Sequence, residues 1–470
     1  MRRALLVAVA VATAMFATAG PAMAHGGFVG QDLQVAASLG DRELTVIIRR
    51  VGEVPGPLRV DVVNHADSPG GTLRIGAAAQ NALPAGNETD LRLGDGGGVT
   101  GSTLRVDRVG AWELWLDDGR ETARLPFVVP EDGPATWEWV MNGGFTVAGA
   151  LLLAALGAAA FGRWWWPPVV LGGAATTAVV VALTAALLSS SLPAETAIDP
   201  VTGRPPDTRA VTADAMSRPH VNLLVDAELT AGQRSPIDLR LVDGGTGRPV
   251  DDLVVHHDAL VHLVVLGPGG QFAHLHPVRV APGVYRVWFR PSSGGEHRIY
   301  AELERRGAGT EAGGVQLVPA TVPVTGPVTA EPVPGGPGDH DVGDGTTMRV
   351  AASGLVAGEP SMLTADVGEA GQPVRDLQRW LGMEGHLITS GPHGTVGHVH
   401  AMPTGRPASP TDPVPDETVA TGGPRVTFVY TFPTAGRHRL WVQVERDYQI
   451  VTVAVELDIA AAVPGTEAGS

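Results

Sequence analysis

The stretch "VHLVVLGPGGQFAHLHPV" (residues 261–278) contains two apolar runs on either side of a Gly-Pro-Gly-Gly turn. Short runs rich in Val and Leu, bounded by Gly and Pro, are typical of two β-strands joined in a hairpin. The stretch "GHLITSGPHGTVGHVHAM" (residues 385–402) has the same layout and begins 124 residues later (385 − 261). We therefore expect the same hairpin, and the domain around it, to occur twice.

The similarity extends beyond the two hairpins. Before them, "GRPVDDL" (residues 247–253) matches "GQPVRDL" (371–377). After them, "EHRIYAELER" matches "RHRLWVQVER". Three matching segments in the same order along the chain predict an internal repeat. The predicted copies cover residues 219–323 and 346–460.

Three histidines are shared by the two hairpins. Of the 18 aligned positions, seven are identical. The identical histidine pairs are His262/His386, His274/His398 and His276/His400. The apolar positions between them have changed among Val, Ile, Leu, Phe, Thr and Ser. A duplicated fold without any other demand should lose its histidines as readily as its valines, so the comparison indicates a role for the histidines themselves.

The composition limits the classes of protein to which the chain can belong. A length of 470 residues predicts roughly two to four domains. A net charge of −16 argues against binding to nucleic acid or to an anionic membrane surface through basic patches. The chain has no cysteine, which excludes disulfides, thiolate metal sites and cysteine nucleophiles. Any metal site must therefore use His, Met or carboxylate ligands.

The N-terminus predicts a signal peptide over residues 1–24. Two arginines precede a short apolar run, and Ala22 and Ala24 fit a signal-peptidase site. An uncleaved anchor is the alternative. Cleavage would leave His25 at the start of the mature chain, where its α-amine, ring nitrogen and backbone amide form a chelate that copper favours. We therefore include His25 among the candidate metal ligands.

Residues 139–188 predict a transmembrane helical hairpin. They contain "VAGALLLAALGAAAF" and "VVLGGAATTAVVVALTAALL", each near the roughly 20 residues that cross a bilayer. Arg163, three tryptophans, Pro167 and Pro168 lie between these runs and predict an interfacial turn. With the signal peptide removed, Arg163 would face the cytoplasm and the remaining domains the extracytoplasmic side.

The rest of the chain predicts β-sandwiches. Residues 25–130 alternate apolar and polar side chains in short runs punctuated by Gly, Pro, Asn and Asp, as in an immunoglobulin-like sandwich. Residues 189–218 and 324–345 lack periodicity and predict linkers. The expected fold is mainly β, with three immunoglobulin- or cupredoxin-like β-sandwich domains and a two-helix transmembrane hairpin.

The strand period predicts a histidine cluster in the first repeat. Alternate residues of a strand share one face, so His274 and His276 point the same way. A hairpin centred on Pro268 would place His262 directly opposite His274, with Cβ atoms about 4.5–5.5 Å apart. A shift by one residue would send the two side chains to opposite faces.

The second repeat predicts the same cluster. A hairpin centred on Pro392 would place His386 opposite His398, with His400 as the diagonal neighbour. A fourth equivalent pair, His297 and His438, falls on the core-facing side of its strand by the same alternation. We include this pair as candidate ligands, although spacing does not show whether it meets the hairpin clusters.

Other histidines lack a counterpart between the repeats. His256 and His257 are replaced by Trp380 and Leu381 in the second copy. His65, in "VVNHADS", lies in a predicted turn. We do not include these three among the candidate ligands.

Neutral imidazoles without a thiolate suit Cu(II) or Zn(II), and the affinity order of divalent ions favours copper. Thioethers favour Cu(I), and only the second copy has Met383 and Met402 close by. The alternative is that the histidines are internal struts, hydrogen-bonded to backbone carbonyls. No paired carboxylate acid and base, nucleophile elbow or phosphate loop accompanies the histidines, so we expect no enzyme.

The residues "VHLVVL…FAHLHP…GEHRIYAEL" resemble a family of uncharacterised bacterial, chiefly actinobacterial, envelope domains of YtkA-like or cupredoxin-like type. That family has a G-H-L strand and an H-x-H-P strand. The first copy keeps Pro277 but has Val261 in place of the glycine, and the second keeps Gly385 but has Ala401 in place of the proline. The resemblance covers the two repeats and implies copper or heavy-metal handling in the cell envelope.

We therefore expect a membrane-anchored envelope protein whose tandem extracytoplasmic domains bind a divalent metal for buffering or delivery. Copper is the expected ion and zinc the alternative. The expected partners are the lipid membrane, the metal ion and a copper chaperone or transporter, without nucleic acid. The alternative function is a structural or protein-interaction role in the envelope, with the histidines as struts.

Overall fold

The computed structural model describes residues 32–49, 51, 53–79, 86–129, 136–162, 164, 166–188, 220–306, 312–329, 333–401, 416–420 and 422–462. The expected signal peptide, His25, Arg163, Met402 and the 189–218 linker lie outside these residues. Within them the chain is mainly β, with sandwiches formed by packed sheets and two long helices. This confirms the fold class expected from the sequence.

The N-terminal sandwich consists of two four-stranded sheets. One sheet has the order β1(Leu33–Leu39), β2(Arg42–Ile48), β3(Gly56–Asn64), β6(Gly98–Val106). The other has the order β5(Glu88–Leu93), β4(Gly71–Ala79), β7(Gly110–Asp117), β8(Thr122–Val129). Alternate apolar side chains from both sheets, such as Val46, Val60, Ile75 and Leu114, form one buried core. The period-2 pattern of the sequence is the cause, since it gives each strand one apolar face.

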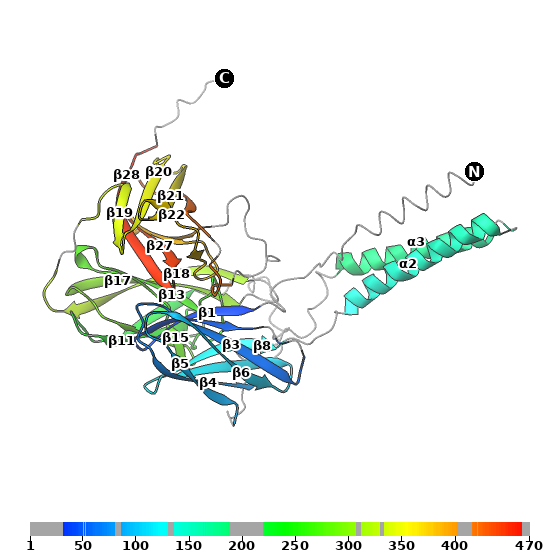
Figure 1. Ribbon diagram of the computed structural model, residues 1–470, viewed down its shortest axis with the longest axis horizontal. Coiled ribbons are helices and arrows are strands. Elements are labelled where there is room, and N and C mark those ends of the chain that lie inside the picture. The colour runs from blue at the N-terminus through cyan, green and yellow to red at the C-terminus, as the bar shows by residue number, and fades with distance from the viewer. Residues whose placement is uncertain are drawn as a thin grey trace, which may run out of the picture.

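Two apolar helices follow, α2(Thr136–Phe161) and α3(Trp166–Leu188). By length and composition both can cross a membrane, with a mean hydropathy of 2.0 in each span. Figure 1 shows them running side by side. Gly144 permits their close approach, because a Cβ added there would lie 2.9 Å from Ala182 Cβ.

The first repeat is a sandwich of two sheets. The first sheet has the order β10(Leu229–Thr230), β18(Ala312–Thr325), β17(Gly295–Arg306), β13(Val261–Leu266), β14(Phe272–Leu275), with β12(Leu253–Val254) also paired to β17. The second has the order β15(Val278–Ala281), β16(Val284–Phe289), β11(Ser235–Asp243), β9(Val221–Asp226). The inner faces contribute Leu239, Leu263, Val287 and Ala301 to a buried core.

The second repeat has the same plan. One sheet has the order β19(Gly338–Gly343), β20(Thr346–Ser353), β21(Pro360–Glu369), β22(Gln372–Pro373), with β26(Arg425–Thr431) also paired to β21. The other has the order β23(Leu377–Gln378), β27(Gly436–Arg446), β24(His386–Ser390), β25(Val396–His400), with β28(Gln449–Ile459) also paired to β27. Strand β19 lies inside the segment expected to be a spacer, where it pairs with β20.

The two repeats pack against each other through the outer faces of their hairpin sheets. Val264, Leu266 and Tyr300 of the first meet Ile388 and Trp441 of the second in one apolar cluster. The rings of Phe272 and Trp441 stack with centroids 4.6 Å apart. The face of each hairpin that points away from its own core is thereby buried. We call this contact between the repeats the seam.

The N-terminal sandwich also contacts both repeats (Figure 1). The amide of Ser38 donates to the carbonyl of His276 at 2.8 Å, and the amide of Ala66 donates to that of Tyr448 at 2.7 Å. Arg49 forms ion pairs with Asp61 in its own sandwich and with Asp416 in the second repeat. The three sandwiches therefore form a continuous packed unit around the seam.

Candidate metal centre

The register of the first hairpin differs from the expected one by two residues. The Gly267 amide donates to the Gln271 carbonyl at 2.9 Å, so the turn is centred on Gly269, whose φ is 74°. Val264 pairs with His274, and the expected pairing of His262 with His274 is wrong. Leu266 pairs with Phe272, so the loop between them holds two more residues than the three-residue loop that we assumed, with Gly269 in the left-handed conformation. A shift of two residues preserves the face, so His262 and His274 still point the same way.

The second hairpin has the same shift. Its turn closes with a hydrogen bond from the Gly391 amide to the Thr395 carbonyl. His386 pairs directly with His400, and His398 faces Ile388 instead of His386. The predicted pairing of His386 with His398 is therefore wrong, although all three histidines remain on one face.

The seam brings the two sets of three histidines together. The ring centroids of His262 and His398 are 5.0 Å apart, and those of His274 and His398 are also 5.0 Å apart. His262, His276 and His386 are 1 %, 0 % and 0 % exposed. We call His262, His274 and His276 the first triad and His386, His398 and His400 the second triad. In each triad one ligand atom per residue lies within 4.8 Å of the others.

Hydrogen bonds fix the tautomers of two rings in the first triad. His262 Nε2 lies 3.0 Å from the His256 carbonyl oxygen, which can only accept. His274 Nδ1 lies 3.0 Å from Gln443 Oε1, while the amide nitrogen of Gln443 donates to Thr452 Oγ1. With the Gln443 amide in this orientation, each ring donates its single hydrogen outward, and its other nitrogen presents a lone pair.

Those two lone pairs face each other. His262 Nδ1 and His274 Nε2 are 3.3 Å apart. A tetrahedral ion with bonds of about 2.0–2.1 Å to nitrogen separates its ligand atoms by roughly 3.3 Å. Two bare acceptors at this distance repel each other unless a cation lies between them.

The third ring of the first triad follows the same pattern. His276 Nδ1 donates to a carboxylate oxygen of Glu43 in the N-terminal sandwich. Its Nε2 is buried and makes no hydrogen bond within the described part of the chain. A carboxylate behind a ligating histidine fixes the ring and raises its basicity, as in many zinc sites. Glu43 gives the first triad one such carboxylate.

The second triad also offers free ring nitrogens. His398 Nδ1 donates to Glu302 Oε2 at 3.2 Å. Buried nitrogens that make no hydrogen bond among the described residues are His398 Nε2, His400 Nε2 and both nitrogens of His386. The indole of Trp380 packs edge-on against His386 with centroids 4.8 Å apart. Buried polar atoms without partners are costly, and a bound ion would satisfy several at once.

The seam also sets the charge state of the histidines. Burial, and then the neighbouring imidazoles, lower the pKa of His262, His274, His386 and His400 well below the ordinary 6.5. These rings are therefore neutral at pH 7, which is the form that binds metal.

Two hydrogen bonds that hold the rings run across the seam, one from each repeat to the other. Glu302 of the first repeat holds His398 of the second, and Gln443 of the second holds His274 of the first. The two residues occupy equivalent positions in β17 and β27. Neither is identified by the sequence analysis, although the alternation in "HRIYAELER" places Glu302 on the face opposite His297.

His256 and His257, not included among the candidate ligands, lie beside the second triad. The rings of His257 and His400 have centroids 3.8 Å apart, and burial lowers the pKa of His257 to about 4. His256 Nδ1 lies 2.9 Å from Glu304. Together with Glu302, the two histidines form a further group of convergent ligand atoms. Comparison of the two copies concealed this group, because Trp380 and Leu381 replace the pair.

His297 and His438 lie on the opposite face of their strands, inside the cores. His297 Nε2 bonds to Gln271 Oε1 at 2.7 Å, and its ring packs against Phe289. His438 Nε2 donates to the Thr434 carbonyl at 2.8 Å. The structure therefore does not bring this pair to either triad, and both rings brace a hairpin from within.

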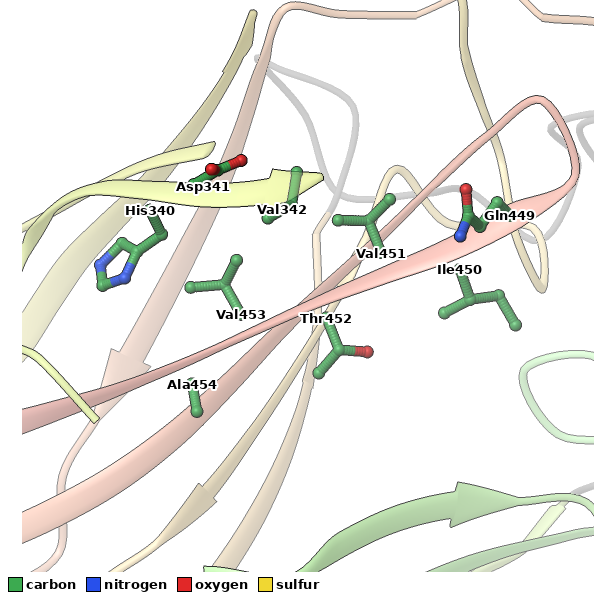
Figure 2. A pocket seen from close by; sticks show the side chains of 9 residues that line it. All are labelled: His340, Asp341, Val342, Gln449, Ile450, Val451, Thr452, Val453 and Ala454. Atoms are coloured by element: carbon green, nitrogen blue, oxygen red, sulfur yellow. The ribbon is translucent and has the colours of Figure 1, made fainter. Parts of the chain in front are cut away.

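A surface hollow of about 300 Å³ lies between β19 and β28. Figure 2 shows it lined by His340 and Asp341 and by largely aliphatic side chains of β28. Among the described residues that line it, none belongs to the two triads. The hollow offers one imidazole and one carboxylate at an open edge, which is a poorer metal site than the buried seam.

Comparison with known proteins supports the repeat. A family model described as "Domain of unknown function (DUF8832)" matches residues 215–325 and 340–461, once for each repeat. No curated protein matches the chain.

Several solved structures match the chain at low similarity. A tetra-tandem repeat from the extending region of a large adhesion protein is 8 % identical, with a TM-score of 0.17, over 91 % of this chain and 74 % of that one. The fibronectin(III)-like modules of Clostridium thermocellum CbhA are 12 % identical, with a TM-score of 0.15, over 52 % of this chain and 95 % of that one. Invasin, a bacterial integrin-binding protein, is 12 % identical, with a TM-score of 0.15, over 89 % of this chain and 60 % of that one. Similarity at this level carries no argument about function.

Proposed function

We propose that the two triads bind a pair of divalent metal ions, one per triad, in the seam between the repeats. Copper is the preferred ion and zinc the alternative. The chain would serve as a membrane-anchored reservoir or carrier on the extracytoplasmic side, held by α2 and α3. A copper chaperone or transporter is the corresponding partner.

One observation carries this proposal. His262 Nδ1 and His274 Nε2 face each other at 3.3 Å, and each ring donates its hydrogen elsewhere. A pair of struts would instead have each ring nitrogen matched to a donor or acceptor. The spacing suits two bonds to one ion.

The chemistry of the ligand set supports copper over other divalent ions. All six ligands are imidazoles, and the order of affinity places Cu(II) above Zn(II) for nitrogen sites. One carboxylate supports each triad, Glu43 behind His276 and Glu302 behind His398. These two negative charges partly offset the charge of two bound ions.

The second candidate function is a structural or interaction role, with the histidines as struts. Four of the six rings use one nitrogen in a hydrogen bond to the protein, namely His262, His274, His276 and His398. Such bonds brace the seam with or without metal.

Metal titration of the full chain separates the two functions. The detergent-purified protein would be stripped with chelator and titrated with Cu(II) and Zn(II) in a calorimeter, beside His274→Ala/His276→Ala. His220→Ala serves as the control, because His220 is exposed. We expect wild type and control to bind the same number of ions and the double variant to bind one fewer. Absence of wild-type binding at micromolar metal would leave the strut role, and unchanged binding in the double variant would move the site elsewhere.

A further inference from the structure

A second group of buried ligand atoms lies where the N-terminal sandwich meets the second repeat. His65 follows β3, Glu445 lies in β27, and Glu417 lies in the segment preceding β26. The three residues are 2 %, 0 % and 0 % exposed. One ligand atom from each lies within 4.8 Å of the other two. None of these residues belongs to either triad.

The atoms converge without forming an ordinary hydrogen-bond network. His65 Nδ1 lies 2.9 Å from Glu445 Oε1, and Thr45 Oγ1 lies 3.2 Å from His65 Nε2. Yet His65 Nδ1, both carboxylate oxygens of Glu445 and Oε1 of Glu417 lack an aligned hydrogen bond among the described residues. Ligands at about 2.1 Å from an octahedral ion lie roughly 3.0 Å apart. The approach of His65 Nδ1 to Glu445 Oε1 therefore matches two ligands of one ion.

The charge of the group has to be balanced by protons or by a cation. Two carboxylates are buried beside one imidazole, and an uncompensated buried carboxylate is costly. Burial and the neighbouring Glu445 raise the pKa of Glu417 well above its ordinary range. Burial opposes protonation of His65, but the carboxylates of Glu445 and Glu417 outweigh it and raise its pKa to about 9. Protons balance this charge without metal, and a divalent ion that displaced them would neutralise both carboxylates and leave His65 as a neutral ligand.

The equivalent position of the first repeat shows how this group arises. There Glu304, the counterpart of Glu445, lies 2.9 Å from Nδ1 of His256 in the same repeat. The second repeat has Trp380 at the position of His256. His65 of the N-terminal sandwich thus supplies, from another sandwich, the imidazole that the second repeat lacks.

We propose that His65, Glu417 and Glu445 form a separate site for a divalent ion that accepts mixed oxygen and nitrogen ligands, such as Mn(II) or Zn(II). Two carboxylates and one imidazole are harder ligands than the six imidazoles of the seam. The ion would join the N-terminal sandwich to the second repeat. This site is independent of the histidine triads, and each can exist without the other.

The test uses the full chain, purified in detergent and freed of metal with chelator. Mn(II) is the probe, followed by electron paramagnetic resonance, because bound Mn(II) loses the signal of the free ion. Binding is measured in wild type and in His262→Ala/His386→Ala, which removes one ligand from each triad. We expect one Mn(II) to bind equally in both. Loss of binding in the double variant would overturn the proposal by moving the ion to the seam.

Glu445→Gln removes a ligand charge while keeping its shape, and Glu296→Gln is the exposed control. We expect the affinity for Mn(II) to fall at least 10-fold in Glu445→Gln and to stay unchanged in the control. Thermal melting provides a readout independent of the seam: Mn(II) should raise the melting temperature of wild type and not that of Glu445→Gln.

Two results would overturn the site. One is the absence of Mn(II) and Zn(II) binding by His262→Ala/His386→Ala up to millimolar metal. The other is a higher melting temperature for metal-free Glu445→Gln together with an unaltered Mn(II) affinity, which would show that protons alone balance the charge.

Discussion

The two repeats carry the same three histidines but support them differently. In the first triad, His276 is backed by Glu43 of the N-terminal sandwich and His274 by the neutral Gln443. In the second triad, His398 is backed by Glu302 of the first repeat. Each triad therefore has one supporting carboxylate, and neither carboxylate comes from the triad's own repeat.

This difference indicates that the geometry of the site depends on contacts between the three sandwiches of the chain. A single repeat contains three histidines on one face of its hairpin. Within its own repeat only His262 is oriented, by the His256 carbonyl, whereas His274, His276 and His398 are oriented by groups of neighbouring sandwiches. A group that accepts a hydrogen bond from the outer nitrogen of a ligating histidine fixes the orientation and tautomer of its ring. An isolated repeat would therefore hold its rings less well than the intact chain, and experiments on the site require all three sandwiches.

The largest expected effect comes from removing one triad at a time. His274→Ala/His276→Ala should lose one of two ions, and His398→Ala/His400→Ala should lose the other, because each variant deletes two of three ligands. Elemental analysis of the purified full chain, expressed with copper, measures the metal content. Loss of both ions in either variant would show instead that the six histidines form one indivisible site.

The sequence predicts the triads because two copies can be compared within one chain. The shared histidines, the strand period and the glycine turn were sufficient to place three rings on one face. The register was wrong by two residues, since the left-handed Gly269 extends the turn. The predicted face of the three histidines was still correct, because side chains two residues apart on a strand point to the same face.

The sequence could not show that the triads meet. That contact depends on the packing of two outer sheet faces, through residues such as Phe272 and Trp441, which resemble ordinary strand residues. Glu43, Gln443 and His65 were missed for the same reason, since each acts in a sandwich other than its own. Spacing along the chain carries no information about such contacts.

The next largest expected effect is a loss of stability on removing one of two equivalent arginines, Arg305 and Arg446. Arg305 is buried, with a side chain 6 % exposed, and pairs with Asp243 at 2.7 Å. Arg446 is 16 % exposed and pairs with Asp376, itself 44 % exposed, at 2.9 Å. Removing one partner of a buried pair costs about 3–5 kcal/mol, whereas a more exposed pair contributes about 1 kcal/mol or less.

We therefore expect Arg305→Met to destabilise the first repeat much more than Arg446→Met destabilises the second. Hydrogen exchange of β17 and β27 amides in the full chain measures the two local free energies of opening. Equal losses in the two strands would mean that the difference in burial has no energetic consequence.

A smaller effect comes from exchanging the residues that support the rings across the seam. Glu302→Gln removes the carboxylate behind His398 and should weaken the second site about 10–100-fold. Gln443→Glu places a carboxylate behind His274 and should strengthen the first site. Competition with a chelator of known copper affinity measures both, with Glu296→Gln as the exposed control.

Equal weakening of both ions by Glu302→Gln would contradict the assignment of Glu302 to the second triad. Weakening of the first site by Gln443→Glu would show that His274 does not use Nε2 for the ion.

The last expected effect concerns a turn that differs between the repeats. Asp258 has φ of 58°, and the equivalent Gly382 has φ of 69°. Glycine adopts this left-handed conformation freely, whereas Asp258 carries a carboxylate whose Oδ2 is buried and makes no hydrogen bond with the described residues. Burial raises the pKa of Asp258 from 3.8 to about 7.

The sign of the pH dependence follows from that shift. In the folded chain Asp258 keeps its proton up to about pH 7, whereas in the unfolded chain it ionises near 3.8. The folded state therefore binds more protons in this interval, and wild type loses stability as the pH rises through it. Asp258→Asn has no proton to lose, so its advantage should grow across the interval and level off above it. Thermal unfolding at a series of pH values measures this difference, with Asp344→Asn as the control at an exposed position of similar φ, 51°. A difference that is the same at pH 4 and pH 8 would show that the turn disfavours aspartate through its backbone conformation, the property that Gly382 shares, and not through its charge.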